Sequence, residues 1–308
     1  MGTTKIAVIG ATGLVGETML KILEERQIKG EYFLFSSDAH VGKKIILNGE
    51  ENIVESLTVE RVKEIKADFA LFAAGAEVAK EWVPQFVAAG TTVIDNSSYY
   101  RMQFGVPLVV PEINLASIGH SKLIANPNCS TIGAVVALAP LDKLYKIKRI
   151  VYATYQAISG AGREPKFKHP IKNNVLPDID VCLPDGNTKE EVKMINETRK
   201  ILGRSDIAIS ATAVRVPVAN CHCVAINVEF YHKPDLNKIK TILAQSPSVV
   251  YCDDYAVPTE VNGHDEVYVG RVRLDASQRN TINLWTVSDN LRKGAATNAV
   301  QIMESLLA

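Results

Sequence analysis

The sequence lacks several features that define other classes of protein. Its 34 Lys and Arg residues balance 34 Asp and Glu residues, so there is no excess of positive charge. Proteins that bind nucleic acid or anionic membranes usually carry such an excess, and we expect neither partner. No run approaches the roughly 18 apolar residues of a membrane span, and the first residues show no signal-peptide pattern. These absences predict a cytoplasmic protein.

Cysteine is also scarce. The five cysteines are an odd number spread through the chain, which favours reduced thiols over a disulfide framework. Cys221, His222 and Cys223 are adjacent and resemble part of a metal site. No second pair of cysteines or histidines lies at zinc-site spacing, however, so we expect no metal.

The chain has 308 residues, 47% of them hydrophobic and 22% charged, as in ordinary globular proteins. At about 150 residues per domain, this length predicts two domains. In the first part, continuous apolar strands alternate with helices, the longest over residues 14–26. Such strands indicate a parallel sheet covered on both faces. They are predicted over residues 5–9, 32–35, 69–73, 92–94, 108–110 and 123–125. We therefore expect an α/β domain of the Rossmann-like, doubly wound type over residues 1–126.

The pattern changes after residue 126. An apolar helix over residues 131–145 leads into longer strands with more alternation, predicted over residues 149–156, 211–218, 222–231, 267–274 and 281–287. Long strands joined by few helices indicate a mixed sheet, so residues 127–293 are predicted to form an α+β domain. Residues 159–185 are rich in Gly, Pro, Lys and Asn and are predicted to be a loop or arm. Residues 294–308 have helical spacing and are expected to pack back onto the first domain.

A glycine-rich turn, GATGLVG over residues 10–16, lies between the first strand and the first helix. Glycines in this position let the backbone approach a pyrophosphate, which the free N–H groups of the helix start then bind. The spacing departs from G-x-G-x-x-G, and a turn that only needs close packing is the alternative. After the second strand, Asp38 favours NAD, whereas Ser37, His40 and Lys43 are suited to the 2′-phosphate of NADP. This segment leaves the cofactor open.

Cys129 lies at the start of the helix predicted over residues 131–145. The helix dipole lowers the pKa of a thiol there, and free N–H groups there could stabilise an oxyanion. A buried structural cysteine is the alternative, but the polar neighbours weigh against it. A reactive thiol beside a nicotinamide suggests chemistry through a thioester.

Thioester chemistry needs an acid or base, and His222 is the best-placed histidine. It lies at the start of a predicted strand, seven residues after Arg215. Because side chains alternate on a strand, His222 is expected to point away from Cys221 and Cys223. A structural role for this histidine remains the alternative.

Six segments of the chain together resemble one known family. They are GATGLVG (10–16), NPNCST (126–131), YQAISG (155–160), ETRK (197–200), RVPVANCH (215–222) and SDNLRKGAA (288–296). In this order they are similar to the motifs of the aspartate-β-semialdehyde dehydrogenase family. The resemblance implies reversible, NADPH-linked reduction of L-4-aspartyl phosphate to L-aspartate 4-semialdehyde, with release of inorganic phosphate. That reaction leads toward lysine, threonine and methionine.

The resemblance also implies roles for individual residues. Cys129 matches the nucleophile, His222 the acid/base, and Gln156 the glutamine that orients the substrate. Arg215 would bind the α-carboxylate and Glu197 the α-ammonium group. The phosphate would be bound by Arg101, Asn128 and Lys200. The positions that match the cofactor site are Gly10, Thr12, Gly13, Leu14, Val15, Ser37, Ser159, Gly160 and Asn290. The second domain would be the catalytic and dimerisation domain of a homodimer or a dimer of dimers.

Two departures from the family affect these expectations. Many members carry an arginine near position 39 that binds the 2′-phosphate of NADP, but this chain has Asp38 and Ala39, so NAD is also possible. The segment 162–177 is shorter than its family counterpart, which usually contributes to the subunit interface. A dimer through the exposed face of the second sheet is still expected, with a smaller contact area.

Several alternatives remain open at this point. Glu197 and Lys200, three residues apart on a predicted helix, could form a solvated ion pair, and Arg101 could belong to a surface loop. An N-acetyl-γ-glutamyl-phosphate reductase is the nearest rival enzyme. A dinucleotide-sensing protein without catalytic activity is the rival from another class.

Overall fold

The chain forms two compact units in a computed structural model that describes residues 3–307. Unit 1 contains the described residues of Met1–Pro111, Leu115–Pro127 and Ala295–Ala308. Unit 2 contains Glu112–Asn114 and Asn128–Gly294. The last helix of the chain is therefore grouped with the N-terminal segment. Within residues 3–307, no helix combines the length and apolar character that crossing a membrane requires.

Unit 1 is built on a seven-stranded sheet with the order β3-β4-β2-β1-β5-β6-β7. Neighbouring strands are parallel, except that β3 and β4 pair antiparallel. The strands are β1 (Lys5–Ile9), β2 (Glu31–Phe35), β3 (Lys44–Leu47), β4 (Glu50–Glu55), β5 (Phe69–Phe72), β6 (Thr92–Asp95) and β7 (Leu123–Ala125). The predicted Rossmann-like sheet is confirmed.

Alternation along the strands explains how helices cover both faces of this sheet. Successive side chains on a strand point to opposite faces. Ile6 and Val8 of β1 belong to a core with helices α1 (Leu14–Glu25) and α9 (Thr297–Leu307). The intervening Ala7 and Ile9 belong to a second core with α2 (Val59–Ile65) and α3 (Ala76–Ala88). Both cores are continuous and apolar, which is why the strands are hydrophobic throughout.

One strand prediction for unit 1 is wrong. The segment 108–110 forms no strand, and Leu108 makes only an isolated parallel bridge to Ala125. Pro107 and Pro111 flank the segment, and proline cannot donate the backbone hydrogen bonds that a strand needs on both sides. The hairpin of β3 and β4 was not predicted, although Asn48-Gly49 between its two strands is a hairpin signal.

Unit 2 is built on a six-stranded mixed sheet with the order β11-β12-β13-β10-β8-β9. The strands are β8 (Ile147–Gln156), β9 (Ala208–Arg215), β10 (His222–Phe230), β11 (Val249–Tyr251), β12 (Val267–Leu274) and β13 (Thr281–Ser288). The outer pairs β8–β9 and β11–β12 are parallel, whereas the three pairs between them are antiparallel. The predicted mixed sheet is confirmed.

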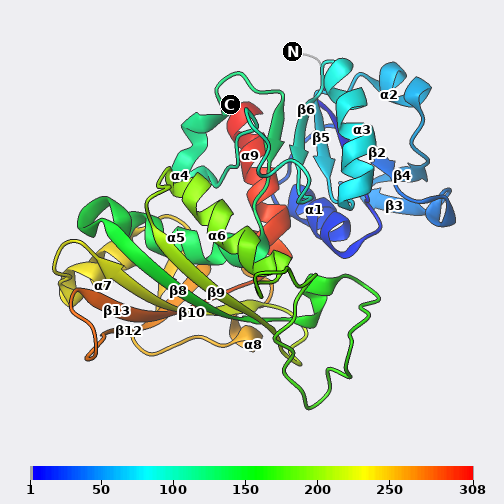
Figure 1. Ribbon diagram of the computed structural model, residues 1–308. Helices are drawn as coiled ribbons and strands as arrows, with labels where there is room; N and C mark the ends of the chain where they lie inside the picture. Colours follow the sequence, from blue (N-terminus) through cyan, green and yellow to red (C-terminus); the bar gives the residue numbers. More distant parts are fainter. Residues whose placement is uncertain (1–2, 308) are drawn as a thin grey trace. The chain divides into compact units, whose positions relative to one another are not determined.

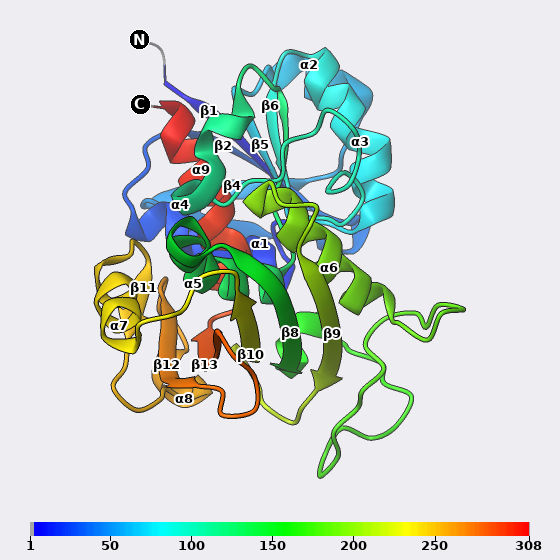
Figure 2. The same cartoon turned by 60° about the vertical axis from the view of Figure 1, so that its left-hand side comes forward.

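Helices cover one face of the unit 2 sheet. They are α5 (Cys129–Tyr145), α6 (Lys189–Leu202) and α7 (Leu236–Gln245), and Figure 2 shows α5 and α6 beside the strands. Twelve residues of α5 are buried, so this helix is the centre of the core. Between β8 and α6, residues 162–187 form a long loop with neither helix nor strand; the loop predicted over residues 159–185 differs in its first three residues, which belong to a short helix. The remaining short helices are η1 (Asp38–His40), α4 (Pro111–Asn114), η2 (Leu115–Ile118), η3 (Ile158–Ala161), α8 (Pro258–Val261) and the π-helix η4 (Arg292–Ala296).

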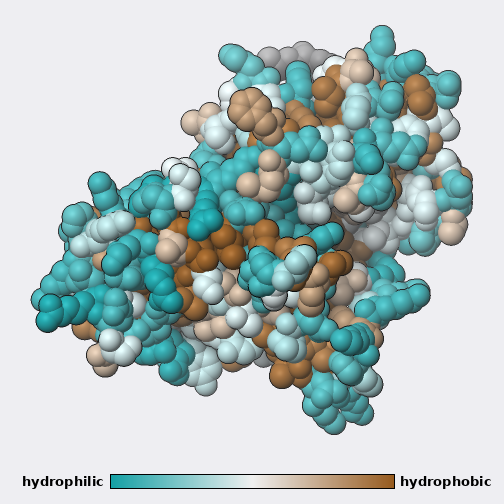
Figure 3. Space-filling model, in the orientation of Figure 1, coloured by the Kyte–Doolittle hydropathy of each residue, from teal (hydrophilic) through white to brown (hydrophobic). Residues whose placement is uncertain are grey.

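The opposite face of the unit 2 sheet is only partly covered. Val151, Ala153 and Tyr155 alternate along β8 with buried residues and are partly or fully exposed. Tyr155 packs its ring against Trp285 of β13, with centroids 5.5 Å apart. The space-filling view in Figure 3 shows apolar patches at the surface of unit 2. Aromatic and aliphatic side chains at a solvent face are typical of a surface that binds another protein.

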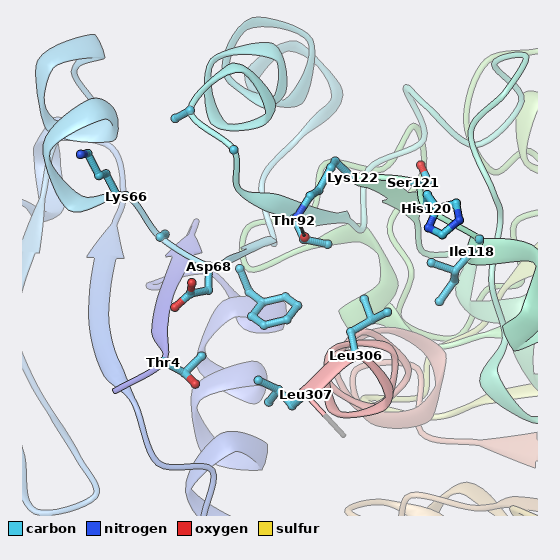
Figure 4. Close-up of a pocket in the computed structure, with 15 residues that line it drawn as sticks. Thr4, Lys66, Asp68, Thr92, Ile118, His120, Ser121, Lys122, Leu306 and Leu307 are labelled. Carbon is cyan, nitrogen blue, oxygen red and sulfur yellow. Dashed lines mark hydrogen bonds between the residues drawn. The ribbon is translucent and has the colours of Figure 1, made fainter. Parts of the chain in front are cut away.

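A cavity of about 860 Å³ lies in unit 1 at the amino ends of its strands. Figure 4 shows Lys122 reaching toward Thr92, with Leu306 and Leu307 at the end of α9. The Nζ atom of Lys122 donates a hydrogen bond of 3.1 Å to Oγ1 of Thr92. In open α/β sheets, ligands bind beyond the carboxyl ends of the strands. This cavity is therefore at the edge opposite to the glycine turn.

Candidate active site

The strand order of unit 2 brings three predicted site residues together. Gln156 and Arg215 end the parallel strands β8 and β9 and are paired in register. His222 begins β10, which runs antiparallel to β8 on its other side. The ends of three adjacent strands therefore meet at one edge. The backbone of Ala157 joins these side chains, because its N–H donates to Nδ1 of His222 (3.1 Å) and its carbonyl accepts from Nη1 of Arg215 (2.6 Å).

Cys129 begins helix α5, and Asn128 is the N-cap residue of this helix. The Oδ1 atom of Asn128 accepts hydrogen bonds from the backbone N–H groups of Ser130 (3.0 Å) and Thr131 (3.1 Å). The prediction that free N–H groups at this helix start would stabilise an oxyanion is therefore wrong for these two groups. The dipole of a 17-residue helix still acts on the partly exposed thiol of Cys129.

Gly294 approaches the nucleophile candidate more closely than another residue could. A Cβ atom at this position would lie 3.0 Å from Cβ of Cys129 and 3.3 Å from its Cα atom. Gly294 lies within the π-helix η4, a rare element that is frequent at functional sites. The glycine in the segment 288–296 therefore leaves room for Cys129 at the start of α5.

Arg215 is a buried cation within electrostatic range of Cys129. Its side chain is 6% exposed. Burial lowers the pKa of Arg215, whereas Cys129 and Glu190 act in the opposite direction and raise it. Because the interaction is reciprocal, the guanidinium favours the thiolate form of Cys129. Cys129, the predicted nucleophile, and Arg215, the predicted carboxylate-binding residue, therefore interact electrostatically.

His222 is fully buried and neutral. Burial, followed by the nearby Arg215, lowers the pKa of His222 to about 3. Since Nδ1 accepts the N–H of Ala157, the neutral ring carries its proton on Nε2. Nε2 is buried and has no hydrogen-bond partner among residues 3–307. The imidazole therefore presents a donor whose partner is a ligand atom.

Gly160 leaves room for the side chains of Arg215 and His222. A Cβ atom at Gly160 would lie 2.8 Å from Nη1 of Arg215 and 2.9 Å from Nε2 of His222. The adjacent Ser159 exchanges hydrogen bonds with the amide of Asn290. The Oδ1 atom of Asn290 also accepts from the N–H of Cys221 at 2.9 Å. Cys221 has a φ of 73°, in the left-handed region that non-glycine residues seldom adopt, so Asn290 holds the strained residue before His222.

Sequence reasoning missed Glu190, which is central to the site. This carboxylate is 6% exposed. Its Oε1 atom accepts from Nδ2 of Asn128 (2.8 Å) and Nε2 of Gln156 (3.2 Å). Burial alone would raise the pKa of Glu190, but Lys193 and these two donors lower it overall. Lys193 donates to Oε2 of Glu190 at 3.2 Å. Helix α6 therefore supplies an ionised carboxylate and a cation to the site.

The predicted residues Glu197 and Lys200 lie seven positions further along α6. Seven residues are about two helical turns, so the two Glu–Lys pairs share one face of the helix. Glu197 is 1% exposed, and its Oε2 atom accepts from the backbone N–H of Asn128 at 2.6 Å. The alternative in which Glu197 and Lys200 form a solvated ion pair is therefore wrong for Glu197. Burial lowers the pKa of Lys200, which Glu197 partly offsets.

The glycine turn of unit 1 has the geometry of a pyrophosphate site. Gly10 has a φ of 81°, and its N–H and that of Ala11 donate to the carbonyl of Phe35 at the end of β2. Gly13 is the N-cap of α1, and no side chain within residues 3–307 caps this helix. An uncapped helix start leaves N–H groups that suit a phosphate oxygen. The residues therefore fit a dinucleotide.

The segment after β2 continues this site. Thr12 and Ser36 share a hydrogen bond of 2.6 Å between their hydroxyl groups. Ser37 pairs with Nδ1 of His40 at 3.3 Å. The carboxylate of Asp38 accepts a hydrogen bond of 2.7 Å from Oγ of Ser56. Asp38 is therefore attached to the neighbouring loop, while Ser37 and His40 form a polar pair beside the turn.

Arg101 is a buried residue of unit 1, although it lies in a loop whose next residues, 102–105, are exposed. It is 8% exposed. Its Nε atom donates to the carbonyl of Asn126, and Nη2 donates to the carbonyl of Asn96, both at 2.9 Å. Burial raises the pKa of Asp95, and Arg101 partly offsets that effect. The guanidinium is thus fixed by carbonyl groups.

The other cysteines differ from Cys129. All five cysteines lie within the described residues and are free. Burial raises the pKa of Cys221 and of Cys223 to about 12, so both are protonated at neutral pH. They belong to an apolar cluster with Val261 and Val287, whereas His222 binds the Ala157 amide. The predicted opposite orientation of His222 is confirmed.

Comparison with known proteins shows the same division of the chain. Residues 5–121 match the family described as "Semialdehyde dehydrogenase, NAD binding domain". Residues 138–293 match "Semialdehyde dehydrogenase, dimerisation domain". The aspartate-semialdehyde dehydrogenase of Aquifex aeolicus is 44% identical in an alignment that covers 98% of each chain. The chain belongs to the aspartate-semialdehyde dehydrogenase family.

Solved structures of the family agree with this placement. Aspartate semialdehyde dehydrogenase II from Vibrio cholerae, complexed with ASA, has a TM-score of 0.94 and 40% identity, and covers 100% of this chain and 99% of its own. The Candida albicans family member, solved with NADP, has a TM-score of 0.81 and 27% identity, covering 100% and 99%. Members of this family are oxidoreductases. An NAD(P)-binding domain and a dimerisation domain are therefore both present in this chain.

Proposed function

We propose that this protein catalyses the reversible, NADPH-linked reduction of L-4-aspartyl phosphate to L-aspartate 4-semialdehyde, with release of inorganic phosphate. The reaction serves the synthesis of lysine, threonine and methionine. The observation that carries this proposal is the cluster of Cys129, Gln156, Arg215 and His222 around the start of α5, with Glu190 beneath it. The names of the relatives support it.

The substrate head group needs a cation for its carboxylate and an anion for its ammonium. Arg215 provides the cation, since a buried guanidinium can bind a carboxylate through two hydrogen bonds. The family resemblance implied Glu197 for the ammonium; we propose Glu190 in its place, because Glu197 accepts a hydrogen bond from the backbone N–H of Asn128. Arg101, Asn128, Lys193 and Lys200 are the candidates for the phosphate group.

Cys129 attacks the acyl carbon of the substrate and forms a thioester as the C–O bond to phosphate breaks. Its thiolate is favoured by the helix dipole and by Arg215. As the carbonyl oxygen becomes an anion, Nε2–H of His222 donates a hydrogen bond to it. His222 stays neutral throughout; once the acyl carbon has been reduced, the carbonyl re-forms, the C–S bond breaks and Cys129 leaves as the thiolate. Gln156 orients the acyl group through its amide, which Glu190 holds.

A nicotinamide, when bound, supplies the hydride that reduces the acyl carbon. The pyrophosphate of the cofactor would be held by the glycine turn, at Gly10, Thr12, Gly13, Leu14 and Val15. Ser37 would hold the adenosine ribose. Ser159, Gly160 and Asn290 would hold the nicotinamide end, because they surround Arg215 and His222 in unit 2.

The partly covered face of the unit 2 sheet is our proposed contact with a second copy of the chain. Tyr155 and Trp285 form the aromatic part of this face. The match to a dimerisation domain over residues 138–293 supports a homodimer, or a dimer of such dimers.

Substrate choice tests the proposed reaction. We expect kcat/KM for aspartate semialdehyde, with phosphate and NADP, to exceed that for N-acetyl-glutamate semialdehyde on the order of 10³-fold. The acetylated substrate brings a neutral amide to Glu190 where aspartate semialdehyde brings an ammonium, so it lacks a charge-assisted contact. Glu190→Gln should remove most of this discrimination, whereas Glu197→Gln, the matched control, should leave it intact. Faster turnover of the acetylated substrate would favour the reductase rival, and dinucleotide binding without any turnover would favour the sensing protein.

Cofactor choice gives a separate prediction. Ala39→Arg should increase the preference for NADPH over NADH about tenfold or more, since a charge-assisted hydrogen bond contributes about 1.5–3 kcal/mol. Dissociation constants from NADPH and NADH fluorescence, together with kcat/KM, measure the change. Ala39→Gln is the control of similar length without charge. Equal affinities in both variants would place 2′-phosphate recognition elsewhere.

A further inference from the structure

The loop over residues 162–187, here called the arm, contacts the site at two points, Leu176 and Asp180. Leu176 exchanges two backbone hydrogen bonds with Arg215, which attaches the middle of the arm to the end of β9. Four residues later, Oδ2 of Asp180 accepts a hydrogen bond of 2.7 Å from Nζ of Lys193. The arm thus contacts Lys193, the cation of α6 that is also a candidate for binding the phosphate group.

Lys193 lies between two carboxylates. Nζ donates to Asp180 on one side and to Oε2 of Glu190 (3.2 Å) on the other. Burial lowers the pKa of Lys193, but the two carboxylates raise it overall. Glu190 is fixed by Asn128 and Gln156, whereas Asp180 belongs to a loop and its side chain is 31% exposed. Of these two carboxylates, Asp180 is the more exposed, because its side chain is 31% exposed and that of Glu190 is 7% exposed.

Asp180 and Arg215 line the same cavity, which measures about 390 Å³. The cavity wall also carries Lys166, Lys168 and Asp178. An acyl phosphate that reaches Arg215 therefore brings a dianionic group near the carboxylate of Asp180, which belongs to a loop. Like charges at short distance repel, and the effect is stronger where the site excludes water.

We propose that Asp180 is an internal competitor for anionic substrate. Its carboxylate occupies the ammonium of Lys193 when no phosphate is bound and releases it when the phosphate group of the substrate, or inorganic phosphate in the reverse reaction, arrives. This inference rests on the proposed function and extends it to the arm. Asp180 then sets the affinity for phosphate and couples the position of the arm to occupancy of the site.

The variant Asp180→Asn tests the proposal. Asp180 has a φ of 69°, which asparagine tolerates well, so the variant keeps the backbone conformation. We expect KM for inorganic phosphate to fall about two- to fivefold, the range of a partly exposed ion pair, with KM for aspartate semialdehyde unchanged. Asp178→Asn removes the same charge from the same cavity without removing the bond to Lys193, and should change neither constant.

Direct binding separates this inference from the proposed reaction. Calorimetric titration of the enzyme with inorganic phosphate should show tighter binding by Asp180→Asn than by the wild type or Asp178→Asn. Hydrogen exchange around residues 178–183 should rise when phosphate binds to the wild type. Unchanged or weaker phosphate binding by Asp180→Asn, or an equal gain by Asp178→Asn, would refute the competitor. A wild type that binds phosphate as expected but turns over no semialdehyde would refute only the proposed reaction.

Discussion

Replacing Cys129 by serine is expected to abolish turnover, with a loss of about 10⁴-fold or more in kcat. The serine hydroxyl occupies the same place at the start of α5 but stays protonated at neutral pH, so neither the helix dipole nor Arg215 can make it a comparable nucleophile. Steady-state rates with semialdehyde, phosphate and NADP measure the loss. NADPH binding, followed by fluorescence, should persist because the glycine turn belongs to unit 1.

Cys182→Ser provides the matched control for this prediction. Cys182 is an exposed thiol of the arm, so its removal should leave the rate within about twofold of the wild type. Turnover by Cys129→Ser at the wild-type rate would exclude a thioester at this residue. A variant that lost both turnover and cofactor binding would instead indicate a change in structure.

Replacing His222 by alanine should lower kcat by about 10²- to 10⁴-fold, the usual range for a lost acid or base. Glutamine should recover part of the rate, since its amide also donates a hydrogen bond from a similar position. His264→Gln, a change at a histidine that packs against Tyr268, is the control. A His222→Ala variant with unchanged kcat would assign the histidine a structural role.

Replacing His222 should also change how the stability of the protein depends on pH. Because the folded-state pKa of His222 is lowered to about 3, the unfolded chain binds a proton that the folded chain does not as the pH falls below about 6.5. His222 thus lowers the free energy of unfolding progressively as the pH falls from about 6.5 toward 3. Denaturant titrations of the wild type and His222→Gln over pH 4–7.5 should show a shallower pH dependence in the variant.

Local patterns predicted much of the fold. Strand β1 and its glycine turn were predictable because continuous apolar residues, a positive-φ glycine and a helix start follow each other within the chain. The segment 108–110 has the same apolar character, yet it forms no strand because prolines lie on both sides of it. The β3–β4 hairpin was missed although its Asn48-Gly49 turn follows the apolar residues of β3 and precedes Ile53 and Val54 of β4.

The site was predictable where a motif and a strand end coincide, as at Gln156, Arg215 and His222. Which of Glu190 and Glu197 would bind the substrate ammonium could not be predicted in this way. Both carboxylates face the same side of α6, and only the position of Asn128 in space shows which contact each one makes. The contact between Asp180 and Lys193 joins a loop without a period to a helix, so no local pattern could have indicated it.

The division of the chain has a consequence for synthesis on the ribosome. Helix α9 contributes Ala299, Val300 and Met303 to the core that covers Ile6 and Val8 of β1, yet α9 follows the whole of unit 2 in the sequence. The first 127 residues therefore emerge from the ribosome without one of the two helices that cover this face of their sheet. Unit 2, whose residues from Asn128 to Gly294 are contiguous, is able to fold before unit 1 is complete. Unit 1 is thus the later of the two to be completed during synthesis.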